Sequence, residues 1–253
     1  MRVVAAAVAE RLADGGVLVV STGAGMSRES GIPTFRGAEG VWRQHRAEDV
    51  ATPQAFHRHP ALFWEFNDHL RQLCAGAAPN AGHLALARLK AELAAPAVFR
   101  LITQNIDRLH EQAGSTGVIH LHGDALRVIC PRCGFADDDF PVPTPELPPH
   151  CTCGSVLRPD IVLFGEMLPE HALTEAFDLA EACDVMWVVG TSMNVQPAAS
   201  LPFVALDHGA LVVEINPEPT PLTDDASYSL RTTAAVGLPP LVAALLETSE
   251  AAP

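Results

Sequence analysis

The sequence predicts an α/β protein built on a doubly wound, mostly parallel, Rossmann-like sheet with a smaller inserted domain. Apolar, strand-like runs recur along the 253 residues, and each of them ends in small or polar residues. Continuous apolar runs are typical of strands that are buried on both faces of a parallel sheet. Helical patterns lie between several of these runs, and this alternation of strands and helices indicates a doubly wound sheet.

The predicted elements follow in order along the chain. The first helix is expected at the N-terminus, where Val4, Val8 and Leu12 recur at helical spacing. Ligands of doubly wound sheets bind beyond the carboxyl ends of the strands, so the polar residues there are expected to converge on one crevice, although polar residues also begin ordinary loops. The strands are expected at 17–20, 98–102, 118–121, 161–163, 185–189 and 211–215, and further helices at 81–94, 170–182 and 197–208.

Two stretches break the alternation and are expected to form the inserted domain. Residues 37–75 are rich in Trp, His, Arg and Phe and are predicted to be helical, without strands. Residues 124–160 contain six prolines between Pro131 and Pro149 and are predicted to be loop-like. The expected domains are 1–36, 76–123 and 161–253 for the sheet, and 37–75 and 124–160 for the inserted part.

Four of the six cysteines lie in the second of these stretches. Cys130 and Cys133 form a C-x-x-C pair, and Cys151 and Cys153 form a tighter C-x-C pair after 17 intervening residues. Clustered thiols in a reducing compartment favour a metal site over disulfides, and four thiolates suit a tetrahedral, structural zinc ion. A metal-free pairing is the alternative, because the second spacing is unusual. The inserted domain is thus predicted to combine a helical module with a zinc-binding module.

Composition narrows the classes of function. The net charge of −14 makes nucleic acid and anionic membranes unexpected partners, because binding to either depends on clustered Lys and Arg. No stretch approaches the ~20 apolar residues of a membrane span, and charged residues soon follow the apolar N-terminal ones, unlike in a signal peptide. We therefore expect a cytoplasmic globular protein, and the sequence predicts no particular oligomeric state.

A glycine turn follows the first predicted strand. Gly23 and Gly25 match the first two glycines of a G-x-G-x-x-G dinucleotide turn, but Arg28 occupies the place of the third. The turn is therefore either an altered nucleotide site or a different site that begins in the same way.

The order of the motifs along the chain is more specific than any one of them, and it resembles the order found in sirtuins. The resemblance extends over nearly the whole chain. The stretch GVWRQHRAEDVATPQAF is similar to the bacterial branch of this family known as protein deacylases or desuccinylases. The other motifs are, in order, GAGMSRESGIPTFRG, TQNIDRLH, HLHGD, the paired cysteines, RPDIVLFGE, VVGTSMNVQPAA and EINPE.

This resemblance implies an NAD-dependent protein-lysine deacylase, in which the acyl group passes from lysine to ADP-ribose and nicotinamide is released. NAD would be the co-substrate, acylated-lysine proteins or peptides the partners, and zinc a structural ion. In this family the glycine turn opens into a mobile loop over the cofactor, so a glycine in place of Arg28 is not expected. The motifs carry over His122, Asn105 and Asp107 as catalytic residues, and Gly23, Ala24, Gly25, Phe35, Arg36, Gln104, Asn105, Ile106, Asp107, Gly190, Thr191, Ser192, Asn216, Glu218 and Ala234 as NAD contacts.

Two histidines, His120 and His122, compete for the role of catalytic base. Residues two apart on a strand face the same side, so position alone does not choose between them, whereas the family pattern favours His122. The resemblance also assigns Val162, Phe164 and Gly165 to the binding of an extended substrate peptide by strand addition, although this segment can also be a buried strand.

The expected acyl pocket departs from the desuccinylase pattern. Those enzymes carry a tyrosine and, three residues later, an arginine, which bind the acyl carboxylate; Asn67 and Leu70 occupy these positions here. Leucine cannot supply a charged fork, and Arg71 lies about 100° further around the helix. We therefore expect the substrate to carry a neutral acyl group, acetyl or a longer apolar chain.

Two other functions are open on the sequence alone. An NAD-dependent mono-ADP-ribosyltransferase of the same fold would modify protein targets without needing acyl-lysine. A non-catalytic NAD-binding module would not require a base, and the presence of His122 together with Asn105 and Asp107 argues against it.

Overall fold

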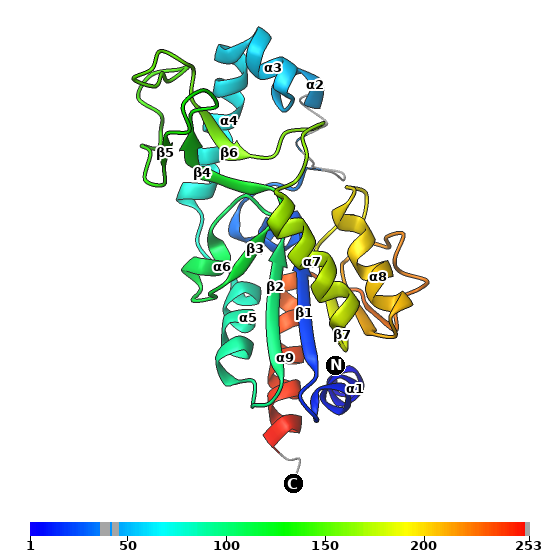
Figure 1. The fold of residues 1–253 in the computed structure, drawn as a ribbon. Coiled ribbons are helices and arrows are strands. Elements are labelled where there is room, and N and C mark those ends of the chain that lie inside the picture. Colours follow the sequence, from blue (N-terminus) through cyan, green and yellow to red (C-terminus); the bar gives the residue numbers. More distant parts are fainter. Residues whose placement is uncertain (36–40, 42–45, 251–253) are drawn as a thin grey trace.

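The computed structural model describes residues 1–35, 41 and 46–250. The chain forms a larger part around one sheet and a smaller part that lies beyond the carboxyl ends of the central strands (Figure 1). The predicted fold class is confirmed. The elements are α1 (Arg2–Leu12), β1 (Val17–Thr22), η1 (Ala24–Met26), η2 (Arg28–Ser30), α2 (Ala47–Val50), α3 (Pro53–Arg58), α4 (Pro60–Gly76), α5 (Ala81–Glu92), β2 (Val98–Thr103), α6 (Leu109–Gln112), β3 (Val118–His120), β4 (Gly123–Ile129), β5 (Ala136–Asp137), β6 (Arg158–Ile161), α7 (Glu170–Ala182), β7 (Val185–Val189), η4 (Ala198–Ser200), α8 (Leu201–Asp207), β8 (Leu211–Ile215), β9 (Tyr228–Leu230) and α9 (Ala234–Glu250).

The large sheet has the strand order β3-β2-β1-β7-β8-β9, and all its described pairings are parallel. The chain order reverses between β1 and β7, which makes this the switch point of a doubly wound sheet. Thr22 pairs with Thr103 of β2 and with Val189 of β7, so the three central strands end level with one another. The loops that follow them therefore meet at one edge, where ligands of such sheets bind.

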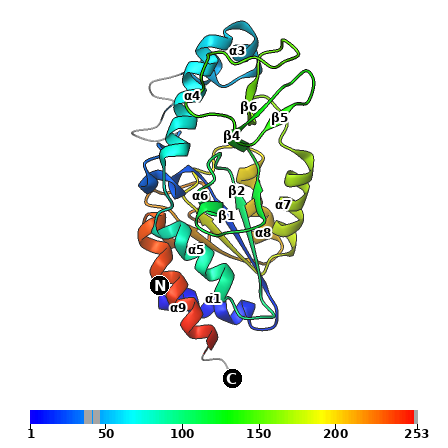
Figure 2. The same ribbon diagram turned by 90° about the vertical axis from the view of Figure 1, so that its left-hand side faces the viewer.

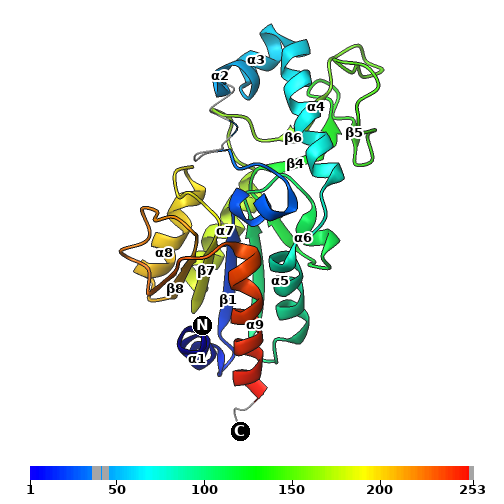
Figure 3. The ribbon, with the colours of Figure 1, turned by 180° about the vertical axis from the view of Figure 1, so that it is seen from behind.

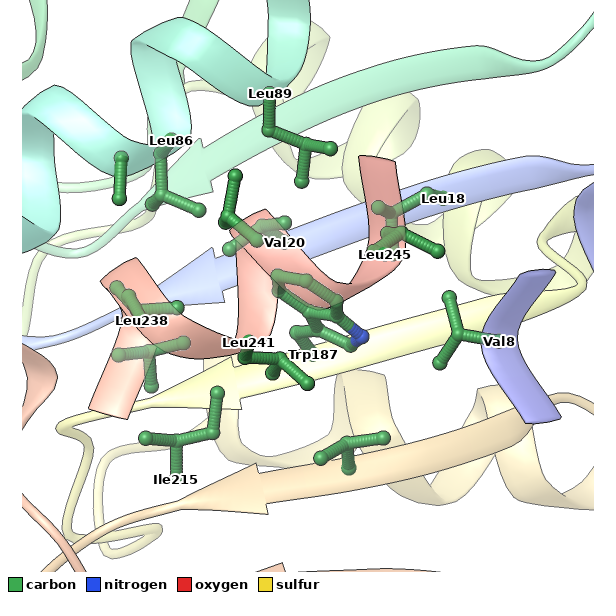
Figure 4. Close-up of a cluster of buried hydrophobic side chains, with 14 of the residues drawn as sticks. Val8, Leu18, Val20, Leu86, Leu89, Trp187, Ile215, Leu238, Leu241 and Leu245 are labelled. Atoms are coloured by element: carbon green, nitrogen blue, oxygen red, sulfur yellow. The ribbon is translucent and has the colours of Figure 1, made fainter. Parts of the chain in front are cut away.

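Helices cover both faces of this sheet. Helices α1, α5 and α9 lie on one face and α7 and α8 on the other (Figures 2 and 3). Alternate residues of β1 divide between the two layers: Leu18 and Val20 pack with the first group of helices, and Val19 packs with the second. Trp187 of β7 lies fully buried in the first layer (Figure 4). Full burial of an aliphatic side chain stabilises a fold by about 1.5–3 kcal/mol, so this two-layer core fixes the strand ends firmly.

The smaller part combines α2, α3 and α4 with a three-stranded antiparallel sheet of order β5-β4-β6. Helix α4 packs against β4, and the indole Nε1 of Trp64 donates to the backbone oxygen of Leu157 at 2.7 Å. Arg71 of α4 is fully buried and donates to the backbone oxygens of Ala125 and Phe140, each at 3.0 Å. These contacts join the helical segment to the cysteine-rich segment.

Two sequence predictions about this region are wrong. Residues 124–160 are not loop-like throughout, because they contain β5 and most of β4 and β6. The strand predicted at 161–163 ends instead at Ile161, and it pairs antiparallel with β4 rather than joining the large parallel sheet. These strands escape prediction because they are only partly buried and, apart from the seven-residue β4, short, so they lack a continuous apolar run. Strand β9 was missed for the same reason.

Among the described residues, no helix combines the length and apolar character needed to cross a membrane.

Candidate active site

A cavity of about 950 Å³ lies between the two parts of the chain, at the ends of β1 and β7. Cavities that enclose small molecules commonly measure ~300–1,000 Å³, so this one can hold a ligand as large as a dinucleotide. Its wall includes every predicted cofactor or substrate residue within the described ranges, apart from Asp107. These are Gly23, Ala24, Gly25, Phe35, Asn67, Leu70, Gln104, Asn105, Ile106, His122, Val162, Phe164, Gly165, Gly190, Thr191, Ser192, Asn216, Glu218 and Ala234.

Asp107 lies beside this cavity rather than in its wall. It lines a small adjoining cavity together with Ser27 and Asn105, and the side chain is buried. Arg36, the remaining predicted cofactor residue, lies outside the described residues.

The glycine turn is shaped chiefly by the loop that follows β7. A Cβ on Gly25 would lie 2.7 Å from the Cα of Gly190, and a Cβ on Gly23 would lie 2.9 Å from the Cα of Thr191. The N–H groups of Gly23 and Gly25 already donate to backbone oxygens of this neighbouring strand and loop, at 3.0 and 2.7 Å. Within the described ranges the N–H of Ala24 has no hydrogen-bond acceptor, so it is the amide of the three that can serve a phosphate oxygen.

Ser27 joins the two predicted catalytic residues that follow β2. Its hydroxyl donates to Oδ2 of Asp107 at 2.8 Å and accepts from Nδ2 of Asn105 at 3.0 Å. Burial raises the pKa of Asp107, and hydrogen bonds from the Leu109 N–H and from Ser27 offset part of that rise. The amide of Asn105 is thereby held in a fixed orientation at the cavity wall.

The structure separates the two candidate histidines. Strand β3 ends at His120, so the strand alternation that would place both side chains on one face does not reach His122. His120 hydrogen-bonds Glu111 at 2.7 Å and is absent from the cavity wall, whereas His122 is part of that wall. The Nδ1–H of His122 donates to the backbone oxygen of Gln104 at 2.9 Å, because a carbonyl can only accept, and this leaves Nε2 as the basic ring nitrogen. Burial lowers the pKa of His122, and the hydrogen bond to Gln104 offsets part of that shift.

A buried carboxylate, that of Glu214, holds in place the segment that forms one end of the cavity wall. Glu214 lies in β8 and is almost fully buried, and its oxygens accept from Thr220, from Thr223 at 2.8 Å and from Ser229 at 2.6 Å. Arg231 pairs with the same carboxylate at 3.2 Å and also donates to the backbone oxygen of Glu218. The segment 216–221, which forms this end of the wall, is therefore fastened to the sheet from beneath.

Asn216 ties this segment to the loop after β7. Its Nδ2 donates to the backbone oxygen of Thr191 at 2.7 Å. Ala234 begins the 17-residue helix α9 and borders the same end of the cavity. Glu29, from the segment after the glycine turn, accepts from the Thr233 hydroxyl and from the Ala235 N–H, each at 2.9 Å. The segments after β1, β7, β8 and β9 are thus linked by direct contacts around one end of the cavity.

Helix α4 supplies the opposite wall. Asn67 and Leu70 are buried and line the cavity, together with Phe66. Arg71 points elsewhere: its guanidinium donates to Asp68, Thr144 and the backbone oxygens named above, all in the smaller part. The cavity wall on α4 therefore presents an amide and apolar carbons, and no cation from the described residues of that helix.

The segment predicted to bind peptide, residues 162–165, is not a strand. The N–H of Val162 donates to the backbone oxygen of His122 at 2.9 Å, and that of Phe164 donates to the backbone oxygen of Ala51 at 2.9 Å. Arg158 forms a bidentate pair with Glu166 at 2.6 and 2.8 Å, which clamps the ends of the segment together. Such paired, charge-assisted hydrogen bonds hold geometry well, so the segment forms a fixed edge of the cavity.

The four predicted metal ligands converge in the smaller part. Their Sγ atoms all lie within 4.8 Å of one another, and Cys130–Cys153 and Cys133–Cys151 are each 3.6 Å apart. A disulfide needs an S–S distance of ~2.05 Å, whereas sulfurs placed ~2.3 Å from a tetrahedral zinc lie ~3.8 Å apart. The arrangement fits a closed four-thiolate zinc site.

Three functional candidates escaped the sequence analysis. Ser27 and Glu29 both lie inside the motif that was recognised, but their partners are about 80 and 205 residues away along the chain, so sequence spacing did not reveal them. Glu214 did carry a usable signal, since a carboxylate inside the apolar run LVVEI must find partners if the strand is buried.

The chain is similar to known proteins over the region that contains these motifs. The model of the Sir2 family matches residues 23–197. The chain is 51% identical over 218 residues to the NAD-dependent protein deacylase 1 of Caldanaerobacter subterraneus subsp. tengcongensis, covering 86% of this chain and 89% of the relative. It is 50% identical over 222 residues to the NAD-dependent protein deacylase of Aquifex aeolicus, covering 87% and 92%.

Several solved structures are similar to this chain over nearly its whole length. A mutant Sir2 homologue in complex with ADP ribose superposes with a TM-score of 0.90 at 43% identity, covering 98% of both chains. A Sir2 homologue–NAD complex gives a TM-score of 0.86 at 44% identity, covering 96% of this chain and 94% of the other. A Sir2 complex with a p53 peptide and NAD+ gives 0.80 at 35% identity, covering 90% and 92%.

Proposed function

Because the chain belongs to the Sir2 family, we propose that it is an NAD-dependent protein deacylase that moves a neutral acyl group from lysine to ADP-ribose and releases nicotinamide. The relatives and the NAD-bound structure support the activity. The observation that carries the proposal is that His122, Asn105 and the loops after β1 and β7 line a single cavity. A non-catalytic module would have no use for a basic nitrogen in that wall.

The cavity residues fit NAD as co-substrate, which supplies the ribose carbon that accepts the acyl oxygen and the nicotinamide that leaves. Ala24 offers a backbone N–H to a phosphate oxygen, and Thr191 and Ser192 border the same loop junction. Asn216 lies against this junction, since its Nδ2 donates to the backbone oxygen of Thr191, and together with Ala234 it would contact the adenosine. Asn105, held by Ser27, is placed to bind a carboxamide through its own amide.

Gly23, Gly25 and Gly190 have an indirect part in this site, because they let the loops after β1 and β7 touch. Gln104 and Ile106 flank Asn105 after the end of β2, and Phe35 and Glu218 also line the cavity. We assign Asp107 to positioning, through Ser27, rather than to direct contact.

His122 acts as general base in this proposal. Its Nδ1–H is fixed on the Gln104 carbonyl, which aligns the ring and leaves Nε2 free to remove a proton from a ribose hydroxyl. Because burial lowers the pKa of His122, the ring is neutral at physiological pH and is ready to act as a base.

The acyl-lysine peptide would enter along Val162, Phe164 and Gly165. The NAD–peptide complex of a Sir2 relative supports this class of partner. Since the N–H groups of Val162 and Phe164 are engaged inside the protein, any strand-like pairing with the peptide uses other backbone groups of this edge.

The acyl preference follows from the wall on α4. A succinyl carboxylate there would meet the carbons of Leu70 and the amide of Asn67, and the Nδ2 donors of Asn67 are already bound to the backbone oxygens of Val50 and Phe63. Arg71 has its donors committed to the smaller part. A buried carboxylate without a charged or donating partner is strongly disfavoured, so acetyl and longer apolar acyl groups suit this cavity. We assign the chain to the desuccinylase-like branch of the family, as a member whose acyl pocket is altered at Asn67 and Leu70.

We also propose that residues 1–36, 76–123 and 161–253 form the NAD-binding domain and that 37–75 and 124–160 form the small domain. The large sheet and its covering helices lie in the first set, and helices α2, α3 and α4 with the cysteine cluster lie in the second. Zinc bound by the four thiolates would hold the cysteine-rich segment against α4 within the small domain and would take no part in the chemistry.

The test uses mass spectrometry to measure the products formed from NAD in the presence and in the absence of an acetyl-lysine peptide. Deacylation predicts peptide-dependent NAD consumption, with free lysine and O-acetyl-ADP-ribose formed in equal amounts. The rival mono-ADP-ribosyltransferase predicts ADP-ribose on protein and no dependence on the acetyl group. A succinyl-lysine peptide serves as the matched comparison, and turnover equal to that of acetyl would remove the acyl preference while leaving the enzyme class intact.

A further inference from the structure

The acyl wall on α4 contains one polar side chain among apolar ones. Asn67 is 2% exposed and lines the cavity. Phe66 and Leu70 of the same helix also line the cavity, as do Ala51 and Leu163 from other segments, and all four are apolar and buried. A single polar group in such a setting discriminates strongly between ligands that satisfy it and ligands that do not.

The orientation of the Asn67 amide is fixed by its neighbours. Nδ2 donates to the backbone oxygen of Phe63 at 2.8 Å and to that of Val50 at 3.1 Å. Both partners are carbonyl oxygens, which only accept, so a flipped amide would set oxygen against oxygen twice. The two hydrogens of Nδ2 are thereby used, and Oδ1 faces away from both carbonyls.

No group in the described part of the chain donates to this Oδ1. The buried polar atoms of those residues that are both sealed from solvent and unpartnered do not include it. Since Asn67 lines the cavity and is otherwise almost wholly covered, Oδ1 is reached from the cavity side. The acyl wall therefore offers one hydrogen-bond acceptor and no free donor on this side chain.

We propose that Asn67 makes the enzyme selective for neutral acyl groups that carry a hydroxyl, such as 3-hydroxybutyryl or lactyl, over the matching chains without one. This inference rests on the proposed deacylase function and names a substrate class within it. An unsubstituted acyl chain would cover Oδ1 and leave it without a donor, which costs free energy. A hydroxyl on the chain would donate to Oδ1 and so supply the missing hydrogen bond.

The experiment compares kcat/KM for matched acyl pairs on one peptide sequence with saturating NAD. The pairs are butyryl against each enantiomer of 3-hydroxybutyryl, and propionyl against each enantiomer of lactyl. A hydrogen bond of ordinary strength predicts that the wild-type enzyme prefers at least one hydroxylated partner by about three- to tenfold. In Asn67→Leu that ratio should fall to one or below, because leucine has a similar volume and no acceptor.

Comparing the two kcat/KM values within one variant separates recognition of the hydroxyl from a folding defect. A general structural defect lowers kcat/KM for both acyl groups of a pair and leaves their ratio unchanged. Leu70→Met, on the same wall, is the matched control and should leave the ratio unchanged. If Asn67→Leu does not fold, Asn67→Ala supplies the same comparison.

A wild-type ratio at or below one for every pair would overturn the proposal, as would a preference that survives in the Asn67 variants. Either result would leave the deacylase assignment standing. Failure of the wild-type enzyme to turn over any acylated peptide would instead remove the proposed function on which this inference rests.

Discussion

The Nδ1–H of His122 donates to the backbone oxygen of Gln104 across 2.9 Å. This hydrogen bond fixes the tautomer of the ring, because the carbonyl accepts and cannot donate. It also links the base to β2, the strand that ends beside Asn105, so both groups are positioned by the same buried strand end. The buried position of His122 therefore predicts how kcat/KM depends on pH.

The acidic limb of kcat/KM should lie below pH 6.5. Burial lowers the pKa of His122 from its ordinary value of 6.5, with partial compensation from Gln104, so the ring stays neutral as pH falls through neutrality. Activity is then lost only when the ring protonates, at a pH below that value. A profile of kcat/KM from pH 5 to 8 measures this, and a limb centred at or above 6.5 would contradict it.

Ser27→Ala should weaken catalysis strongly although it removes only one hydroxyl group. The hydroxyl is the shared partner of Asp107 and Asn105, and its loss leaves a buried carboxylate and a cavity-wall amide each short of one hydrogen bond. We expect about 1–3 kcal/mol less stability and a loss of about tenfold or more in kcat/KM. Ser30→Ala, on the same segment, is the control, since Ser30 only accepts from Asn80. Equal activity in the two variants would refute the role of Ser27.

Glu214→Gln should raise KM for NAD without a matching rise in KM for the acyl peptide. The carboxylate fastens segment 216–221 through three hydroxyls and Arg231, and the amide loses the charge that holds Arg231. We expect about a tenfold change in KM for NAD, the worth of one charge-assisted hydrogen bond. Asp68→Asn, a buried carboxylate in the smaller part, should lower thermal stability and leave KM for NAD unchanged. Parallel changes in both KM values would indicate a general structural effect instead.

Zinc removal should loosen the smaller part before the large sheet. Cys130 and Cys151 lie in a buried cluster with Phe56 and Trp64, so metal loss frees four thiolates beside a hydrophobic core that depends on their position. Hydrogen exchange after treatment with a chelator should show early loss of protection in β4 and β6, with β1 and β7 still protected. Metal analysis should give one zinc ion per chain. Fully active protein without zinc would contradict the structural role.

The double variant Asn67→Tyr, Leu70→Arg should gain succinyl-lysine turnover relative to acetyl-lysine. Arginine in place of Leu70 would supply a charged fork to the cavity wall, which Arg71 cannot do because it is bound in the smaller part. The ratio of the two kcat/KM values measures the switch. An unchanged ratio would mean that the acyl carboxylate does not reach this wall.

Much of the larger part could be predicted from local signals. The apolar runs of β1, β7 and β8 are buried on both faces, as is most of β2 apart from the exposed Arg100, so their burial shows directly in the residue types. The cysteine cluster could be predicted from the spacing of its two pairs, and the four Sγ atoms do converge. The polar residues after these strands line one cavity because parallel strands bring their carboxyl ends to one edge.

The remainder depends on contacts between distant segments. Strand β6 pairs antiparallel with β4, from which the cysteine-rich segment separates it in sequence, and the four residues of β6 alone carry no signal of that pairing. Gly25 appeared to serve a phosphate, but its lack of a side chain is what lets Gly190 approach, and the two residues lie 165 positions apart in the sequence. Arg71 could be excluded from the cavity by helical spacing, whereas its five donors and their partners could only be found in three dimensions.

The most direct test of the account is the product mixture of wild-type protein and His122→Ala with NAD and an acetyl-lysine peptide. We predict O-acetyl-ADP-ribose and free lysine from the wild type, and no such product from His122→Ala, although calorimetry should show that the variant still binds ADP-ribose. That outcome would place the base of an NAD-dependent deacylase at His122. Undiminished O-acetyl-ADP-ribose from His122→Ala, or none from the wild type while ADP-ribose is bound, would contradict it.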